Sequence, residues 1–155
     1  MTGALVIRTA ISEDLSSVLD LLDELREGVG RTDPPVRAEP PRLAEVWETI
    51  IRDQGRMFLV AELDRVVVGT ADMAIIPNIT HDARPSAFVE RVVVGEPHRG
   101  RGIGSALMED VVARARSAGC YKVTFMSNKR RTQAHAFYRR LGFKSTSEGF
   151  RLDLP

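Results

Sequence analysis

One stretch of the sequence, residues 88–107, constrains the fold more than any other, and it reads FVERVVVGEPHRGRGIGSAL. It contains a β-branched run, Val92–Val94, that predicts a buried strand. Glycines follow at positions 100, 102 and 104, and apolar residues then recur at helical spacing from Ile103 to Ala118. The glycines therefore lie between a strand and the first turn of a helix, where orphan N–H groups and a partial positive charge attract anions. This arrangement predicts a cradle for a pyrophosphate group.

Two common phosphate-binding motifs do not fit this stretch. A P-loop requires Lys and then Ser or Thr after its last glycine, and Arg101 and Gly102 stand there instead. The dinucleotide fingerprint requires Gly-x-Gly-x-x-Gly in a first βαβ unit, whereas these glycines alternate and lie late in the chain. On the glycines alone, a plain glycine-rich turn without a ligand is the alternative.

A second block, NKRRTQAHAFYRRLGF at residues 128–143, makes the pattern specific. The first block, Arg99-x-x-Gly102-x-Gly104 after a valine-rich strand, resembles the acetyl-CoA signature of the GCN5-related N-acetyltransferases. That family typically places an asparagine after a strand, followed by Ala-x-x-Phe-Tyr and then Leu-Gly-Phe. The matching residues here are Asn128, Ala134, Phe137, Tyr138, Leu141, Gly142 and Phe143. The resemblance covers residues 86–150 well and the N-terminal half by pattern only.

The resemblance implies an α/β fold of the acyl-CoA N-acyltransferase type in a single domain, residues 1–155, around a mixed central sheet of about six or seven strands. The expected order is a strand, two helices, three strands, a helix, a strand, a helix and a final strand. Periodicity places strands at 5–8, 56–62, 65–76, 88–94, 121–127 and within 144–154, and helices at 12–25, 43–51, 102–118 and 132–141. The sheet is expected to splay between strands 88–94 and 121–127. Gly69, inside a strand, predicts a bulge or a close neighbour.

Acetyl-CoA is the cosubstrate that the resemblance implies, and no metal is expected. Its pyrophosphate is expected on the N–H groups of residues 101–105, and its pantetheine against strand 88–94 as a pseudo-strand. Asn128 is expected to bond either the pantetheine or the start of the last helix. The residues assigned to acetyl-CoA are Val92, Val93, Val94, Arg99, Gly100, Arg101, Gly102, Ile103, Gly104, Ser105, Asn128, Phe137 and Tyr138.

Two residues are predicted to be catalytic in a direct transfer of acetyl to a primary amine. An ammonium must lose a proton before it attacks, and Glu90 is the candidate base, either directly or through a water. Partial burial in the apolar strand is expected to tune this carboxylate, while a salt bridge or exposure at a strand end is the structural alternative. Asp72 is the reserve base. Tyr138 occupies the position of the family's usual general acid, which protonates the departing thiolate.

Two further expectations concern strand 88–94, one about the thioester carbonyl and one about the two faces of the strand. A backbone N–H near Val92 is expected to polarise the thioester, as an oxyanion donor does. Alternation along strand 88–94 places Phe88, Glu90, Val92 and Val94 on one face, and Val89, Arg91 and Val93 on the other.

Composition and motif counts bound the remaining possibilities. The net charge of +1 argues against nucleic acid as a partner, and no apolar run approaches the ~20 residues of a membrane span. Cys120 is the only cysteine, so no internal disulfide can form, and with no leader segment predicted a reducing, cytoplasmic location is expected. The histidines at 81, 98 and 135 lack metal-ligand spacing.

Several functional questions stay open at the level of sequence. The acceptor is an unidentified amine, with a small molecule favoured over a protein lysine, and loops 30–41 and 77–86 are expected to line its pocket. A CoA-binding or regulatory domain without transferase activity is the main alternative, and a nucleotide or nucleic-acid binder that uses the arginine cluster is the second. A homodimer is possible.

Overall fold

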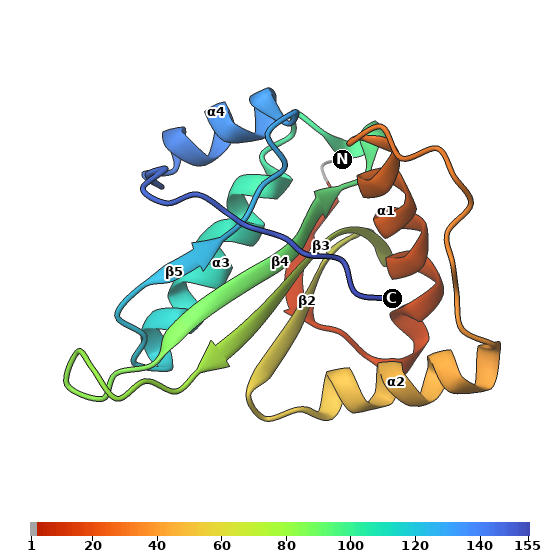
Figure 1. The fold of residues 1–155 in the computed structure, drawn as a ribbon. Coiled ribbons are helices and arrows are strands. Elements are labelled where there is room, and N and C mark those ends of the chain that lie inside the picture. Colours follow the sequence, from red (N-terminus) through yellow and green to blue (C-terminus); the bar gives the residue numbers. More distant parts are fainter. Residues whose placement is uncertain (1–2) are drawn as a thin grey trace. The chain divides into compact units, whose positions relative to one another are not determined.

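The computed structural model describes residues 3–155, and within them five strands form one mixed sheet (Figure 1). The sheet order follows the sequence order from β1 to β5. Strands β1 to β4 pair antiparallel, and β5 runs parallel to β4. The strands are β1 (Leu5–Thr9), β2 (Arg56–Leu63), β3 (Val66–Ile76), β4 (Ser86–Val94) and β5 (Val123–Phe125).

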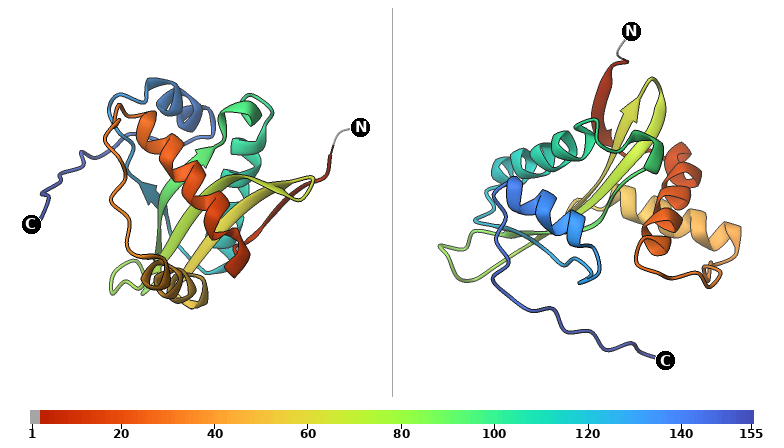
Figure 2. Two further views of the ribbon diagram at one scale, coloured as in Figure 1. Left: turned by 90° about the vertical axis from the view of Figure 1, so that its right-hand side faces the viewer. Right: turned by 90° about the horizontal axis from the view of Figure 1, so that it is seen from above.

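Helices cover both faces of this sheet. A 3-10 turn, η1 (Ser12–Asp14), leads into α1 (Leu15–Glu27), which lies with α2 (Pro40–Arg52) on one face, and α3 (Ile103–Ser117) covers the other (Figures 1 and 2). Another 3-10 turn, η2 (Glu96–His98), joins β4 to α3.

The chain divides into two compact units. The first ends at Phe125, and the second, Met126–Pro155, contains α4 (Thr132–Arg140). The organisation of residues 1–155 as one domain stays a prediction.

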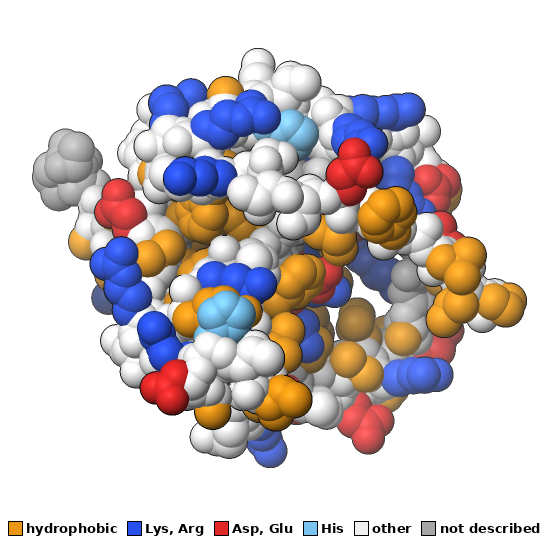
Figure 3. Space-filling view, turned by 60° about the vertical axis from the view of Figure 1, so that its left-hand side comes forward, with side chains coloured by type: hydrophobic (Ala, Val, Ile, Leu, Met, Phe, Trp, Pro, Cys, Tyr) orange, Lys and Arg blue, Asp and Glu red, His pale blue; other side chains and the backbone are white. Residues whose placement is uncertain are grey.

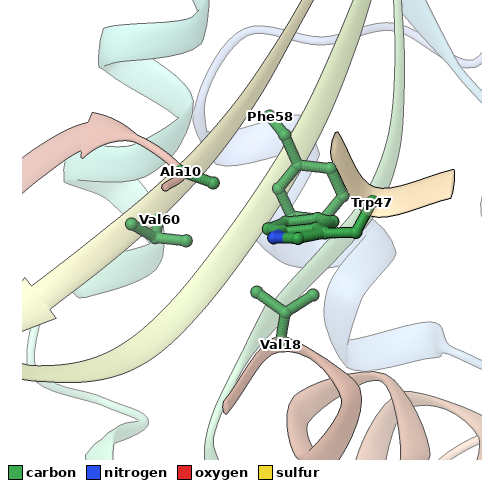
Figure 4. Packing of buried hydrophobic residues seen from close by; sticks show 5 residues of the cluster. All are labelled: Ala10, Val18, Trp47, Phe58 and Val60. Carbon is green, nitrogen blue, oxygen red and sulfur yellow. The ribbon is translucent and has the colours of Figure 1, made fainter. Parts of the chain in front are cut away.

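An aromatic pair anchors the core on the α1 and α2 face. Trp47 and Phe58 meet edge to face, with ring centroids 5.0 Å apart, and Val18, Val60 and Ala10 pack around them (Figure 4). The indole Nε1 of Trp47 donates a hydrogen bond to the carbonyl of Ile11 at 3.2 Å, so its one polar atom is satisfied. This cluster fixes α1 and α2 against β2.

The opposite face of the sheet packs against one stripe of α3. Leu107, Met108, Val111 and Ala115 recur at the spacing of a helical face, and all four are buried. The expected helix is confirmed, because this spacing presents a continuous apolar stripe to the sheet.

The predicted sheet of six or seven strands is wrong, because the described residues contain five. The strand expected at 121–127 is only Val123–Phe125, and no strand forms within 144–154. Phe150, Leu152 and Leu154 alternate as in a strand, yet they are 81–89% exposed. An alternating pattern becomes a strand only when its N–H and C=O groups find a partner strand, and none pairs with this segment in residues 3–155.

Candidate active site

Strand β4 is paired very unequally along its two edges. Its ladder with β3 runs from Ser86 to Val94, whereas its ladder with β5 covers only Ala87–Val89. The segment Glu90–Val94 therefore has no strand partner on its β5 side within residues 3–155. An edge of this kind offers main-chain groups to an extended ligand.

A β-bulge interrupts β4 where the pairing with β5 ends. Asp72 pairs with Glu90 and Thr70 pairs with Val93, so Ala71 alone faces two residues of β4. Arg91 is one of these two, and its φ of 54° is left-handed, a conformation that is uncommon for a residue with a side chain.

The bulge overturns the predicted distribution of side chains on β4. Thr70 and Asp72 lie two residues apart on β3 and so share a face. Their partners Val93 and Glu90 therefore also share that face, although an unbroken strand would separate them. The prediction that placed Glu90 with Val92 and Val94 is wrong for this reason.

Four charged side chains gather beside the bulge, on the face that carries Phe58. Asp72, with a side chain only 3% exposed, accepts hydrogen bonds from Arg56 Nε at 2.7 Å and from Arg56 Nη2. It also accepts one from Arg91 Nη1 at 3.0 Å, and the same nitrogen donates to Glu90 Oε2 at 2.7 Å. The hydrogen bond to Asp72 raises the pKa of Arg56, so its guanidinium stays charged.

The sequence predicted partial burial of Glu90, but the side chain is exposed. Its side chain is 48% exposed and it pairs with Arg91, so the salt-bridge alternative is the one observed. Both oxygens of Asp72, the reserve base, are already engaged by arginine donors. Of these two carboxylates, Glu90 is therefore the one with a solvent-accessible side chain.

The glycine-rich turn after β4 has the backbone that an anion cradle requires. Gly100 and Gly102 have φ of 72° and 79°, and a Cβ added at either would meet nothing within 4 Å. Gly102 is the N-cap of α3, and its carbonyl accepts the first intrahelical bond from Ala106 N. No side chain of residues 3–155 caps this helix start. The N–H groups of its first turn, including Ile103 to Ser105, therefore lack intrahelical acceptors, and the space beside Gly100 and Gly102 is open.

The two arginines of the turn differ in how firmly they are held. Arg99 Nε donates to the carbonyl of Val94 at 2.8 Å, and its Nη2 lies 3.4 Å from Glu24 of α1. Within residues 3–155, the side chain of Arg101 makes one contact, between its Nη1 and His98 Nδ1 at 3.4 Å. Arg99 thus connects the turn to the end of β4, whereas Arg101 is exposed to solvent.

The second unit carries the remaining predicted site residues. The side-chain oxygen of Asn128 accepts a hydrogen bond from Arg130 N at 2.9 Å, and its carbonyl accepts one from Arg131 N at 3.0 Å. These two bonds hold the turn that leads into α4, and a contact of Asn128 with the pantetheine stays a prediction. Phe137 and Tyr138 lie on α4 with ring centroids 5.2 Å apart.

The phenol of Tyr138 is tuned toward its protonated form. The residue is 6% exposed, and burial raises the pKa of the phenol above its ordinary value, while nearby Arg131 offsets part of that effect. A raised pKa keeps the O–H proton in place through neutral pH. The group therefore has the state that a general acid needs before it reacts.

Sequence reasoning did not identify Thr70, Arg91 or Arg56 as parts of this site. One signal for the bulge was present, because the adjacent charges Glu90 and Arg91 break the apolar run of β4. Thr70 carried no such signal, since nothing in its local sequence shows that its hydroxyl donates to the carbonyl of Arg91 at 2.7 Å.

Two features of the described residues concern metals and membranes. No group of three His, Cys, Asp or Glu side chains in residues 3–155 could hold a metal ion. His81 instead stacks on Tyr121, with ring centroids 3.9 Å apart. None of the helices in this range is both long and apolar enough to span a bilayer.

Comparison with known proteins assigns the chain to a family. The profile of the Acetyltransferase (GNAT) family matches residues 18–143. The chain is 35% identical over 153 residues to the glucosamine 6-phosphate N-acetyltransferase of Trypanosoma brucei brucei, covering 97% of this chain and 96% of that protein. It is 30% identical over 115 residues to the aminoglycoside N(6')-acetyltransferase type 1 of Stenotrophomonas maltophilia, covering 73% and 75%. A crystal structure of a Trypanosoma brucei acetyltransferase matches with a TM-score of 0.80 and 35% identity, covering 97% and 100%.

The chain therefore belongs to the GNAT family of acetyltransferases, as its two motifs predicted. It is an enzyme of the N-acetyltransferase class, and enzymes of this family take the acetyl group from acetyl-CoA.

Proposed function

We propose that this enzyme transfers acetyl directly from acetyl-CoA to the primary amine of a small molecule. The observation that carries the proposal is the open edge of β4, Glu90–Val94, which the turn at 95–102 connects to the uncapped start of α3. An extended thioester cofactor needs both features, an edge for its pantetheine and N–H groups for its pyrophosphate.

The cofactor is proposed to lie along β4 and end at the glycine turn. Its pantetheine bonds Val92–Val94 main chain to main chain, and its pyrophosphate sits on the N–H groups of residues 101–105. The absence of a Cβ at Gly100 and Gly102 supports this placement, because it leaves the approach to those N–H groups open. Asn128 and Phe137 are proposed as further cofactor-binding residues.

The proposed chemistry moves two protons. Glu90 takes one from the ammonium of the acceptor, directly or through water, and the freed amine attacks the thioester carbon. The bond from carbon to sulfur then breaks, and Tyr138 donates its proton to the departing thiolate. The exposure of Glu90 and the raised pKa of Tyr138 support these roles.

The acceptor is proposed to be a small amine rather than a protein lysine. A relative that spans nearly the whole chain is named for glucosamine 6-phosphate, and another is named for aminoglycosides. An amino sugar phosphate is therefore the first acceptor to test, and aminoglycosides are the second. Basic and acidic side chains are interspersed on the face drawn in Figure 3, which fits a small acceptor better than a nucleic acid. A cytoplasmic location is proposed on the lone cysteine.

A panel of amines with detection of free CoA tests the function. Turnover of acetyl-CoA that depends on one amine, with the acetylated product found by mass spectrometry, supports the proposal. Tight binding of acetyl-CoA with no turnover on any amine, sugar phosphate or peptide lysine would favour the alternative of a CoA-binding or regulatory domain.

Two variants test the proposed roles. Tyr138→Phe is expected to lower kcat by about 10²-fold with little change in affinity for acetyl-CoA. Glu90→Gln is expected to flatten the acidic limb of the pH–rate profile. A kcat equal to that of the wild type in the first variant, or an unchanged limb in the second, would remove that residue from its role.

A further inference from the structure

We propose that Thr70 and Asp72 of β3 are positioning residues that hold the β4 bulge and aim Glu90. This inference rests on the proposed function, because the bulge matters for catalysis only if the thioester lies along β4. Neither residue needs to touch a substrate. Both act through Arg91, the left-handed residue of the bulge.

The backbone of the bulge is held by Thr70. The side-chain hydroxyl of this fully buried residue donates to the carbonyl of Arg91 at 2.7 Å. The register shift takes Arg91 out of the regular ladder, so its carbonyl needs a donor other than the facing strand. Thr70 supplies that donor from the strand that faces the bulge.

The side chain of the bulge is held by Asp72. Arg91 Nη1 lies 3.0 Å from Asp72 Oδ2, and Asp72 is itself fixed by two donors of Arg56. The carboxylate therefore has little freedom to turn, since one rigid guanidinium already orients it. Arg91 is thus tied to β3 at its backbone and at the end of its side chain.

The bonds from Thr70 and Asp72 stabilise the left-handed conformation of Arg91, which is unfavourable by itself. A left-handed φ is unfavourable for a residue with a Cβ, and such strain persists only where the surroundings impose it. Without Thr70 and Asp72, the peptide groups that follow Arg91 are free to rotate. The first of these peptides carries the N–H of Val92, which is the expected donor to the thioester carbonyl.

The same side chain also reaches the proposed base. Arg91 Nη1 donates both to Asp72 and to Glu90, so it lies between the two carboxylates. Moving Arg91 away from Asp72 therefore displaces Glu90 as well as the bulge. Asp72, the reserve candidate for the base, is assigned a positioning role instead, because its oxygens are occupied by arginine donors.

Control variants distinguish a positioning role of Thr70 and Asp72 from a general loss of stability. Asp72→Asn is compared with Asp14→Asn, because Asp14 is also buried and also binds an arginine of a strand, Arg8 of β1. Thr70→Val is compared with Thr49→Val, because the Thr49 hydroxyl also donates to a carbonyl, that of Glu45 in α2.

Kinetics give the first readout, for all four variants at a temperature where each is folded. Asp72→Asn is expected to lower kcat by about 30-fold and Thr70→Val by about 10-fold, because small displacements of a reacting group cost rate steeply. KM for acetyl-CoA is expected to change less than threefold, and the two controls are expected to keep kcat within about twofold. Loss of kcat in each control equal to that of its partner would overturn the proposal, and Thr70→Val alone decides it if Asp72→Asn does not fold.

Amide hydrogen exchange in the free protein gives a second readout that does not need turnover. Exchange at residues 91–93 is expected to accelerate at least tenfold in Thr70→Val and Asp72→Asn, and to stay unchanged in the controls. Unchanged exchange in both β3 variants would overturn the proposal that Thr70 and Asp72 hold the bulge, even if the enzyme is active. Conversely, the wild type could acetylate no amine while its variants show faster exchange. That result would refute the proposed function but would support the proposal that Thr70 and Asp72 hold the bulge.

Discussion

The sheet contains two β-bulges, one in β3 and one in β4, and they are built differently. In β3 the extra residue is Val68, which lies between the pairs Ala61 with Gly69 and Glu62 with Val67. Val68 is 2% exposed, its carbonyl accepts a hydrogen bond from Gly95 N at 2.9 Å, and its φ is not left-handed. The β4 bulge places a left-handed, charged Arg91 at the surface and holds it with side chains.

This difference shows where the molecule tolerates strain. The β3 bulge is satisfied by main-chain bonds and apolar packing, so it bends the sheet at little conformational cost. The β4 bulge requires an unfavourable φ and two dedicated side chains of β3, and it lies on the edge proposed for the thioester. Strain that is maintained in this way points to a functional requirement at that position. Substitutions at the two kinds of irregular position should therefore separate stability from activity.

The largest effect is expected for Gly102→Val at the start of α3. A valine there must adopt a φ of 79° and would fill the open approach to the helix N–H groups. Affinity for acetyl-CoA should fall by about 2 to 3 kcal/mol, roughly a hundredfold, since charged hydrogen bonds are lost. Calorimetric titration measures it. Gly119→Val is the control, because Gly119 has a φ of 76° and equally open space at the other end of α3. Equal affinities in the two variants would exclude the cradle.

An intermediate effect is expected for Val68→Ala in the β3 bulge. Removing two buried methyl groups should lower the free energy of unfolding by about 2 kcal/mol, or Tm by about 4–8 °C. Activity should be retained while the protein is folded, because this bulge serves the fold. Val66→Ala, at a residue 57% exposed on the same strand, should change Tm very little. A large loss of kcat with an unchanged Tm in Val68→Ala would contradict the distinction between the bulges.

The smallest effect is expected from comparing Arg91→Gly with Arg91→Ala. Both remove the guanidinium, but only alanine keeps a Cβ at a φ of 54°, so the glycine variant should be more stable by about 1 kcal/mol. Urea unfolding measures this difference. The same comparison at Arg65, whose φ is 66° in the turn between β2 and β3, should give a similar difference in stability with no change in kcat. Equal stability of the two Arg91 variants would show that this conformation is not strained.

Much of this site could be predicted from the sequence because its signals are local. The glycines at 100, 102 and 104 and the stripe that begins at Ile103 fix where α3 starts, whatever the rest of the chain does. Gly69 predicted a bulge or a close neighbour, and both are found, since a Cβ there would lie 3.1 Å from the carbonyl of Val93.

The β4 bulge could not be placed from sequence, because its cause is not local. The bonds made by the left-handed Arg91 come from Thr70 and Asp72, some twenty residues earlier. The missing last strand has the same explanation. Phe150 to Leu154 has the alternation of a strand, but pairing depends on a partner whose presence the alternation does not encode.

The extra residue in β4 is not needed for the pairing at either end of the strand. Beyond Arg91, each side chain lies on the face opposite to the one that uninterrupted alternation would assign. Deleting one of the two residues between Glu90 and Val93 would leave one residue of β4 opposite Ala71, so the pairs of Glu90 with Asp72 and of Val93 with Thr70 could both be kept in an unbroken ladder. A chain one residue shorter there would therefore keep both ends of the strand in place and lose only the bulge, with its left-handed Arg91 conformation.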